Sequence, residues 1–277
     1  MSEQVRAPGT RGRSPEDLLR VAVATAREAG ELVRSMRADG VEVADTKSSS
    51  VDIVTAADRT CEELIRTRLQ ALGPDDGFIG EEGEDVPSTS GVTWIVDPID
   101  GTVNYLYGLP EYAVSIAASV EGQVVAGVVR SPVPDLEYAA TLGGGATCNG
   151  VPVLVRSTPP LDQSLVATGF GYEAEARARQ GLAVARMLPR VRDVRRRGSC
   201  ALDLCAVASG QCDAYVEEGP HDWDYAAGGL VAQEAGATFE VWTTAGGRDL
   251  VLCAPAPAWE GFTDLVRDCG FLDEDPA

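Results

Sequence analysis

Apolar residues near the amino terminus recur every three or four positions. From Leu18 to Met36 this spacing predicts an amphipathic helix with one apolar face. Ser14 followed by Pro15 is a typical helix start, because serine caps the first turn and proline fits its backbone. Gly40 stands where the periodic pattern stops, and glycine commonly ends a helix. We therefore expect one long helix between these two boundaries.

A second helix is predicted after the polar run Asp45–Ser50, which we expect to be a loop. Thr55 is followed three residues later by Asp58, the spacing of a capping box in which the two residues satisfy each other's backbone N–H groups. The helix should end at Gly73 and Pro74, since both residue types interrupt helices.

The period then shortens to that of strands. Val114–Val120 and Val124–Val129, joined by Glu121 and Gly122, predict a hairpin. Two further strands are expected in this half, at Leu136–Thr141 and Val151–Val155. After Ser157 strands and helices alternate. The expected strands there are Leu165–Thr168, Val191–Arg196, Ala214–Val216, Thr238–Trp242 and Leu250–Ala254, and the expected helices are Ala174–Leu188, Ala201–Ser209, Tyr225–Ala235 and Trp259–Cys269.

This order of elements predicts two halves of different class. Residues 14–156 are predicted to form an α+β half and residues 157–277 an α/β half, preceded by a mobile arm over residues 1–13. A chain of 277 residues is long enough to bury a large core.

Composition narrows the classes of partner. The net charge of −20 disfavours nucleic acid and anionic membranes. It does not exclude a phosphate substrate, because divalent cations bound in a carboxylate-lined cleft would reverse the local charge. The seven cysteines include no Cys-x-x-Cys pair, which fits a reduced interior better than a disulfide framework. No secretory pattern or membrane-spanning apolar run is present, so a cytoplasmic location is expected.

The strongest chemical signal follows a short apolar run. Trp94–Val96 predicts a buried strand, and Pro98, which has no backbone N–H, is expected to end it. Gly101 then allows close approach of the backbone, and Thr102 supplies a hydroxyl. Three oxygen donors between them could hold a hard cation: Asp97, the carbonyl of Ile99 and Asp100. This pattern indicates metal-assisted hydrolysis of a phosphate ester.

Three more blocks strengthen this interpretation. They are Asp52–Asp58, the run Gly80–Gly83 after two apolar residues, and Trp223–Gly228, in which Asp224 opens a predicted helix. In this order the four blocks resemble the inositol monophosphatase family of magnesium-dependent, lithium-sensitive phosphatases, from about Leu18 to about Phe271. The resemblance implies a layered α-β-α-β-α sandwich of the inositol monophosphatase and fructose-1,6-bisphosphatase type. It also implies two or three Mg²⁺ ions per site and a homodimer.

The resemblance assigns roles to individual residues. Glu81, Asp97 and the Ile99 carbonyl would hold the first magnesium, and Asp97, Asp100 and Asp224 the second. A third, weaker ion would contact Glu81 through waters. Thr102 and Asp58 would activate the attacking water near Glu81. The implied substrate contacts are Asp100, Gly101, Thr102, Cys200, Glu217 and Asp224, and Lys47 and Asp52 would contact the site from a loop.

Each residue also has a plainer reading. Acids at strand ends are commonly solvated, Asp58 could serve only as a helix cap, and Cys200 could be a small buried apolar residue. The backbone amides of Gly198–Cys200 could face an anion or a hydroxyl. The run Arg195, Arg196 and Arg197 could hold a second substrate phosphate, shape a dimer contact or simply end a strand in solvent.

Other function classes fit the sequence less well. Haloacid-dehalogenase-like phosphatases use Asp-x-Asp-Gly-Thr, whereas Asp97–Thr102 has one residue more between its two acids. The same loop lacks the ligand spacing of a calcium-binding EF-hand. A non-enzymatic regulatory protein on this fold is a further alternative. The leading substrate is myo-inositol 1-phosphate, and its rivals are fructose 1,6-bisphosphate, histidinol phosphate and a nucleotide 2′- or 3′-phosphate.

Overall fold

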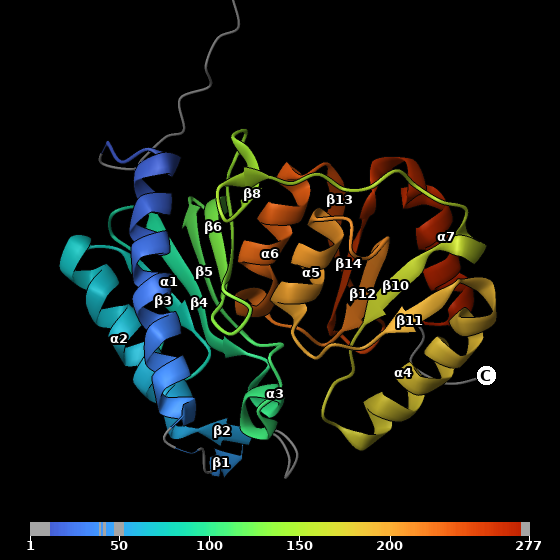
Figure 1. The fold of residues 1–277 in the computed structure, drawn as a ribbon, viewed down its shortest axis with the longest axis horizontal. Helices are drawn as coiled ribbons and strands as arrows, with labels where there is room; N and C mark the ends of the chain where they lie inside the picture. Colours follow the sequence, from blue (N-terminus) through green and yellow to red (C-terminus); the bar gives the residue numbers. More distant parts are fainter. Residues whose placement is uncertain (1–11, 39, 41–42, 47–52, 273–277) are drawn as a thin grey trace, which may run out of the picture.

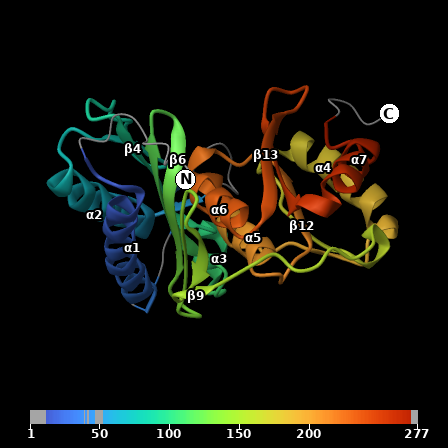
Figure 2. The same cartoon turned by 90° about the horizontal axis from the view of Figure 1, so that it is seen from above.

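Five layers of alternating helices and sheets make up the molecule (Figures 1 and 2). The computed structural model describes residues 12–38, 40, 43–46 and 53–272. Helices α1 (Pro15–Ala38) and α2 (Ala56–Leu72) form one outer layer. Helices α5 (Cys200–Ala208) and α6 (Asp222–Glu234) lie between two sheets. The remaining outer layer holds α4 (Ala174–Met187) and α7 (Trp259–Cys269). The predicted α-β-α-β-α sandwich is confirmed.

The sheet beside α1 and α2 has seven strands in the order β3-β4-β5-β6-β7-β8-β9. Their bounds are β3 Gly77–Gly80, β4 Val92–Asp100, β5 Ala113–Val120, β6 Gln123–Ser131, β7 Leu136–Thr141, β8 Gly145–Cys148 and β9 Val151–Pro152. Only β3 and β4 pair in parallel; the other neighbours are antiparallel. The predicted hairpin is β5–β6, and its turn residues Glu121 and Gly122 both have positive φ, as a tight two-residue hairpin turn requires.

The second sheet has five strands in the order β11-β10-β12-β14-β13. Their bounds are β10 Leu165–Thr168, β11 Asp193–Arg195, β12 Ala214–Glu218, β13 Ala237–Thr243 and β14 Asp249–Pro255. The first three are parallel, and β14 runs antiparallel to both of its neighbours. Short 3-10 helices cover Leu161–Gln163, Leu188–Arg190 and Ala256–Ala258. The strands and helices predicted after Ser157 are all present, with ends shifted by a few residues.

Pro98 does not end its strand, contrary to the sequence-based expectation. Strand β4 continues to Asp100, and its pairing with β5 changes register between Asp97, opposite Ser115, and Asp100, opposite Ala113. A bulge of this kind leaves residues without a ladder partner, so the missing N–H of Pro98 costs nothing there. The bulge also turns the two aspartates toward the same space.

Several short elements were not predicted. Strands β1 (Val43–Thr46) and β2 (Ile53–Thr55) form a small antiparallel sheet, so Asp45 and Thr46 belong to a strand and not to the predicted loop. Helix α3 (Thr102–Tyr107) and strand β8 were missed because six and four residues show no clear period. Of the strand predicted at Val151–Val155, only the first two residues form a strand, which is β9.

Helix α6 explains how distant segments meet. It packs against strands of both sheets, including β4, β5 and β13, and five of its seven buried residues are alanine or glycine. Because it begins at Asp222, its first turn lies beside the bulge of β4. None of the helices in the described ranges combines the length and apolar character needed to cross a membrane.

Candidate active site

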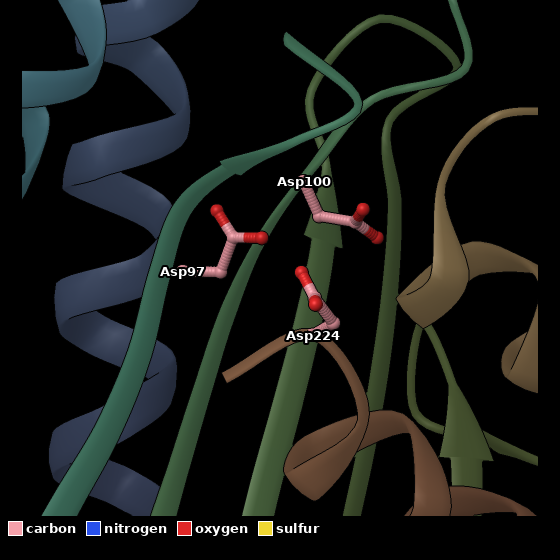
Figure 3. Close-up of side chains that lie close together, drawn as sticks. All are labelled: Asp97, Asp100 and Asp224. Atoms are coloured by element: carbon pink, nitrogen blue, oxygen red, sulfur yellow. The ribbon is translucent and has the colours of Figure 1, made fainter. Parts of the chain in front are cut away.

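Three buried or half-buried aspartates meet where β4 ends and α6 begins (Figure 3). Asp97 and Asp100 come from the bulge of β4, and Asp224 comes from the first turn of α6. One carboxylate oxygen from each lies within 4.8 Å of the others. Asp97 is only 1 % exposed, so these are not the solvated strand-end acids of the plainer reading.

The cluster is electrostatically unfavourable on its own. Burial raises the pKa of Asp97 well above its usual range, and the carboxylates of Glu81, Asp100 and Asp224 raise it further. The pKa of Asp224 is raised for the same reasons. Burial raises the pKa of Asp100 to about 7, although hydrogen bonds from Ser199 and Ala201 oppose the rise. Crowded hard oxygen donors with no cationic side chain among them suit a divalent cation such as Mg²⁺.

Asp100 is held by the start of α5. Its Oδ2 accepts hydrogen bonds from Ser199 Oγ at 2.5 Å and from the Ala201 N–H at 2.7 Å, and its Oδ1 accepts from the Cys200 N–H at 3.2 Å. The Cys200 N–H, which the sequence analysis expected to face an anion or a hydroxyl, faces the carboxylate of Asp100. Ser199 also caps α5, since its Oγ accepts from the Leu202 N–H at 3.3 Å.

Thr102 and Asp58 lie within hydrogen-bonding distance. Thr102 Oγ1 donates to Asp58 Oδ1 at 3.1 Å, and it lies 3.1 Å from the Ile99 carbonyl oxygen as well. The other oxygen of Asp58 accepts from the backbone and hydroxyl of Thr55, which completes the predicted capping box. Burial raises the pKa of Asp58 to about 6 against the lowering effect of Thr55. The cap is confirmed, and it leaves an oxygen for Thr102.

A pocket of about 550 Å³ opens over this cluster. Nine predicted site residues line it: Glu81, Asp97, Ile99, Asp100, Gly101, Thr102, Cys200, Glu217 and Asp224. Asp58 is buried behind Thr102 and reaches the pocket only through that hydroxyl. Lys47 and Asp52 lie outside the described residues.

Glu217 is another of the residues that line the pocket. Its Oε2 accepts from the Tyr215 hydroxyl at 2.7 Å, and burial raises its pKa. The carboxylate lies so close to Gly169 that a side chain at that position would collide with it. Cys200, next to it in the lining, is 6 % exposed, and burial raises the pKa of its thiol. A buried thiol held in the neutral form is consistent with the small apolar reading of Cys200.

The three consecutive arginines do not act together. Arg195 pairs with Asp193 at 2.6 Å, and Arg197 lies 3.7 Å from the buried Asp203. Only Arg196 lines the pocket. Further lining residues were not found from the sequence, among them Phe170, Gly171, Tyr172, Glu173, Gln180 and Arg248. These residues form no motif, since they come from a loop, a helix face and a hairpin.

Comparison with known proteins agrees with the fold. The family model described as "Inositol monophosphatase family" matches residues 14–262. The chain is 45 % identical over 269 residues to inositol-1-monophosphatase SuhB of Mycobacterium tuberculosis, covering 88 % of this chain and 90 % of that one. It is 36 % identical over 228 residues to the Nus factor SuhB of Salmonella typhimurium, covering 82 % of this chain and 85 % of the relative.

Solved structures give the same answer. The structure of Mycobacterium tuberculosis SuhB has a TM-score of 0.82 and 39 % identity, with 94 % of this chain and all of that chain covered. The Thermotoga maritima IMPase has a TM-score of 0.80 and 29 % identity, with coverage of 91 % and 98 %. Together with the site, these matches define a phosphoric monoester hydrolase. The chain belongs to the inositol monophosphatase family, as its four sequence blocks predicted.

Proposed function

We propose that this chain is a Mg²⁺-dependent phosphomonoesterase that hydrolyses a small polyol or sugar phosphate, with myo-inositol 1-phosphate as the leading substrate. The carrying observation is the buried group of Asp97, Asp100 and Asp224 under a pocket that also holds Thr102 and Glu217. The relatives named as inositol-1-monophosphatases support this substrate.

The proposed metal ligands are the carboxylates of Glu81, Asp97, Asp100 and Asp224 and the carbonyl of Ile99, all of which line the pocket. When bound there, Mg²⁺ would supply the positive charge that attracts the phosphate and makes water easier to deprotonate. The number of ions, two or three, and sensitivity to lithium belong to the proposal through the family resemblance.

Thr102 is proposed to orient the attacking water. Because its hydroxyl hydrogen points to Asp58 or to the Ile99 carbonyl, its oxygen is left to accept a hydrogen bond from a water in the pocket. Asp58 in its ionised form would hold the Thr102 hydroxyl in this orientation. Glu217, which accepts a hydrogen bond from Tyr215, would accept hydrogen bonds from hydroxyls of the leaving alcohol.

In this mechanism water attacks phosphorus directly and no phosphoenzyme forms. The stereochemical course at phosphorus tests this point, with a substrate whose phosphate is made chiral by oxygen isotopes. One direct attack by water inverts the configuration, whereas a covalent aspartyl route through Asp97 or Asp100 has two displacements at phosphorus and retains it. Retention would overturn the proposed chemistry.

A panel assay with Mg²⁺ tests the substrate. The panel should contain myo-inositol 1-phosphate, fructose 1,6-bisphosphate, histidinol phosphate and a nucleotide 2′- or 3′-phosphate. We expect the highest kcat/KM with myo-inositol 1-phosphate. If phosphate were released only from one of the other compounds, that compound would replace myo-inositol 1-phosphate as the proposed substrate. If no compound of the panel released phosphate, the proposed function would be overturned. A purely regulatory role is less well supported, because the site residues are assembled around one pocket.

The location, the assembly and the partners of the protein are proposed from the sequence and from the family resemblance. The cytoplasm as location and a homodimer as assembly remain part of the proposal. A small phosphorylated metabolite is the expected partner, with no nucleic acid or membrane.

A further inference from the structure

We propose that Glu62, supported by Arg66, is a positioning residue that holds Glu81 in the pocket. This inference rests on the proposed function, because it takes Glu81 as a metal ligand. Neither Glu62 nor Arg66 lines the pocket, and neither belongs to the four sequence blocks.

Glu62 contacts the backbone on both sides of Glu81. It is only 3 % exposed, and its Oε2 accepts a hydrogen bond of 2.8 Å from the N–H of Glu82, the residue directly after Glu81. The same carboxylate lies against the residue directly before: a side-chain carbon added to Gly80 would fall 2.6 Å from Glu62 Oε2. One buried side chain thus accepts a hydrogen bond from the residue after Glu81 and lies close against the residue before it.

Arg66 adds further contacts to the segment that contains Glu81. Its Nη2 donates to Glu62 Oε1 at 3.0 Å, and its Nη1 donates to the carbonyl of Glu84 at 3.0 Å. Its guanidinium also lies 4.0 Å from the ring centre of Phe78 in strand β3. A side-chain carbon on Gly83 would fall 2.7 Å from Arg66 Nη2. The glycines on either side of Glu81 and Glu82 are therefore explained by the close approach of Glu62 and Arg66.

Glu62 also lies one helical turn from a second site residue. Asp58, Glu62 and Arg66 are spaced four residues apart on α2, so their side chains share one face of the helix. Asp58 receives the hydroxyl of Thr102, and Glu62 holds the Glu81 segment. One rigid helix thus sets the distance between the proposed water-orienting pair and a proposed metal ligand.

The test measures Mn²⁺ binding in the absence of substrate. The electron paramagnetic resonance signal of the free ion gives the amount of Mn²⁺ that is not bound. Mn²⁺ accepts the same oxygen ligands as Mg²⁺. Glu62→Ala should weaken Mn²⁺ binding by about 10-fold or more, the usual effect of removing a residue that orients a metal ligand. The Mg²⁺ concentration for half-maximal activity should rise by a similar factor, with kcat at saturating Mg²⁺ changed little. Exchange of the Glu82 amide hydrogen should become faster.

Two variants make the result specific. Glu62→Gln keeps an oxygen for the Glu82 N–H and should stay within about threefold of the parent in Mn²⁺ binding. Arg68→Ala is the matched control: Arg68 lies on the same helix and makes a two-bond ion pair with Glu28 on α1, but does not touch the Glu81 segment. It should leave Mn²⁺ binding and Glu82 exchange unchanged.

Three outcomes would overturn the inference, and they are distinguishable. Unchanged Mn²⁺ binding in Glu62→Ala would remove the positioning role while leaving the proposed function intact. Equal losses in Glu62→Ala and Arg68→Ala, with equal falls in Tm, would show only general destabilisation. If the parent protein itself bound no Mn²⁺ and needed no Mg²⁺, the proposed function would fail together with this inference.

Discussion

Ser199 Oγ and Asp100 Oδ2 lie 2.5 Å apart although 99 positions separate the two residues in the sequence. This hydrogen bond joins the bulge of β4 in one sheet to the start of α5 in the middle layer. Together with the N–H groups of Cys200 and Ala201, it holds the carboxylate of Asp100 beside Asp97 and Asp224.

Removing that hydroxyl should weaken the site more than the fold. Ser199→Ala deletes the bond to Asp100 and the N-cap of α5, so the free energy of unfolding should fall by about 1 kcal/mol. Binding of Mg²⁺ should weaken by about 10-fold, because Asp100 loses its orienting partner. Ser199→Thr keeps the hydroxyl and should restore both values, as measured by urea unfolding and Mg²⁺ titration of activity. Full Mg²⁺ affinity in Ser199→Ala would show that the two backbone amides suffice.

Asp97→Asn should be among the most damaging substitutions for activity. Asp97 is central to the cluster, and losing its charge should lower kcat at least about 1000-fold. The fold should survive, because Asn keeps the oxygen that accepts from the Ile99 N–H at 2.9 Å. Steady-state kinetics and Tm separate the two effects. An unfolded variant would indicate a structural role for Asp97, and near-normal kcat would remove it from the metal site.

Thr102→Ala and Asp58→Asn should behave as one unit. Thr102→Ala removes the donor of the 3.1 Å hydrogen bond, and Asp58→Asn replaces its charged acceptor with a neutral amide, so each should depress kcat with little loss of Mg²⁺ binding. The double variant should be no slower than the slower single variant, because residues in one network are not additive. Multiplied losses in the double variant would contradict the pairing. Asp58→Asn should also lower Tm, since Asp58 caps α2.

The stability of the metal-free protein should fall as pH rises. Asp58 and Asp100 have folded-state pKa values of about 6 and about 7, above the ordinary 3.8. A raised folded pKa means that the folded state binds more protons, so these groups stabilise below pH 3.8 and lose that effect as pH rises through 6 to 7. Tm in chelator should therefore decrease between about pH 5 and pH 8.

Saturating Mg²⁺ is the control for this prediction. A cation that stabilises the ionised carboxylates should flatten the decrease or reverse its sign. Asp100→Asn should reduce the slope in chelator, since it removes one of the titrating groups. A Tm in chelator that rises over the same pH range in the parent protein would contradict the assignment.

The long, periodic or strongly punctuated elements could be predicted from the sequence. Helix α1, the capped start of α2 and the β5–β6 hairpin carry local signals that need no tertiary information. Four site blocks could be read because their glycines and acids are clustered along the chain. The continuation of β4 through Pro98 could not, since it depends on where β5 changes register.

The remaining site residues have only long-range signals. The attachment of Asp100 to α5 depends on how the middle layer packs, so the sequence near Cys200 could equally have left those amides open. The lining residues Gln180 and Arg248 come from segments that neither share a motif nor lie near one another in the chain. The spacing of Asp58, Glu62 and Arg66 was visible, but its purpose appears only when the Glu81 segment lies against it.

Asp58 and Asp224 each have a second task in the fold. Asp58 caps α2, and Asp224 Oδ2 accepts from the His221 N–H at 2.6 Å at the start of α6. A descendant that had abandoned catalysis would still be selected to keep both acids, because replacing Asp58 would leave the buried Thr55 N–H without its partner and replacing Asp224 would remove a hydrogen bond at the start of α6. The presence of these two residues in a relative therefore indicates folding as much as turnover. A relative without activity would be recognised by substitutions at other residues of the pocket.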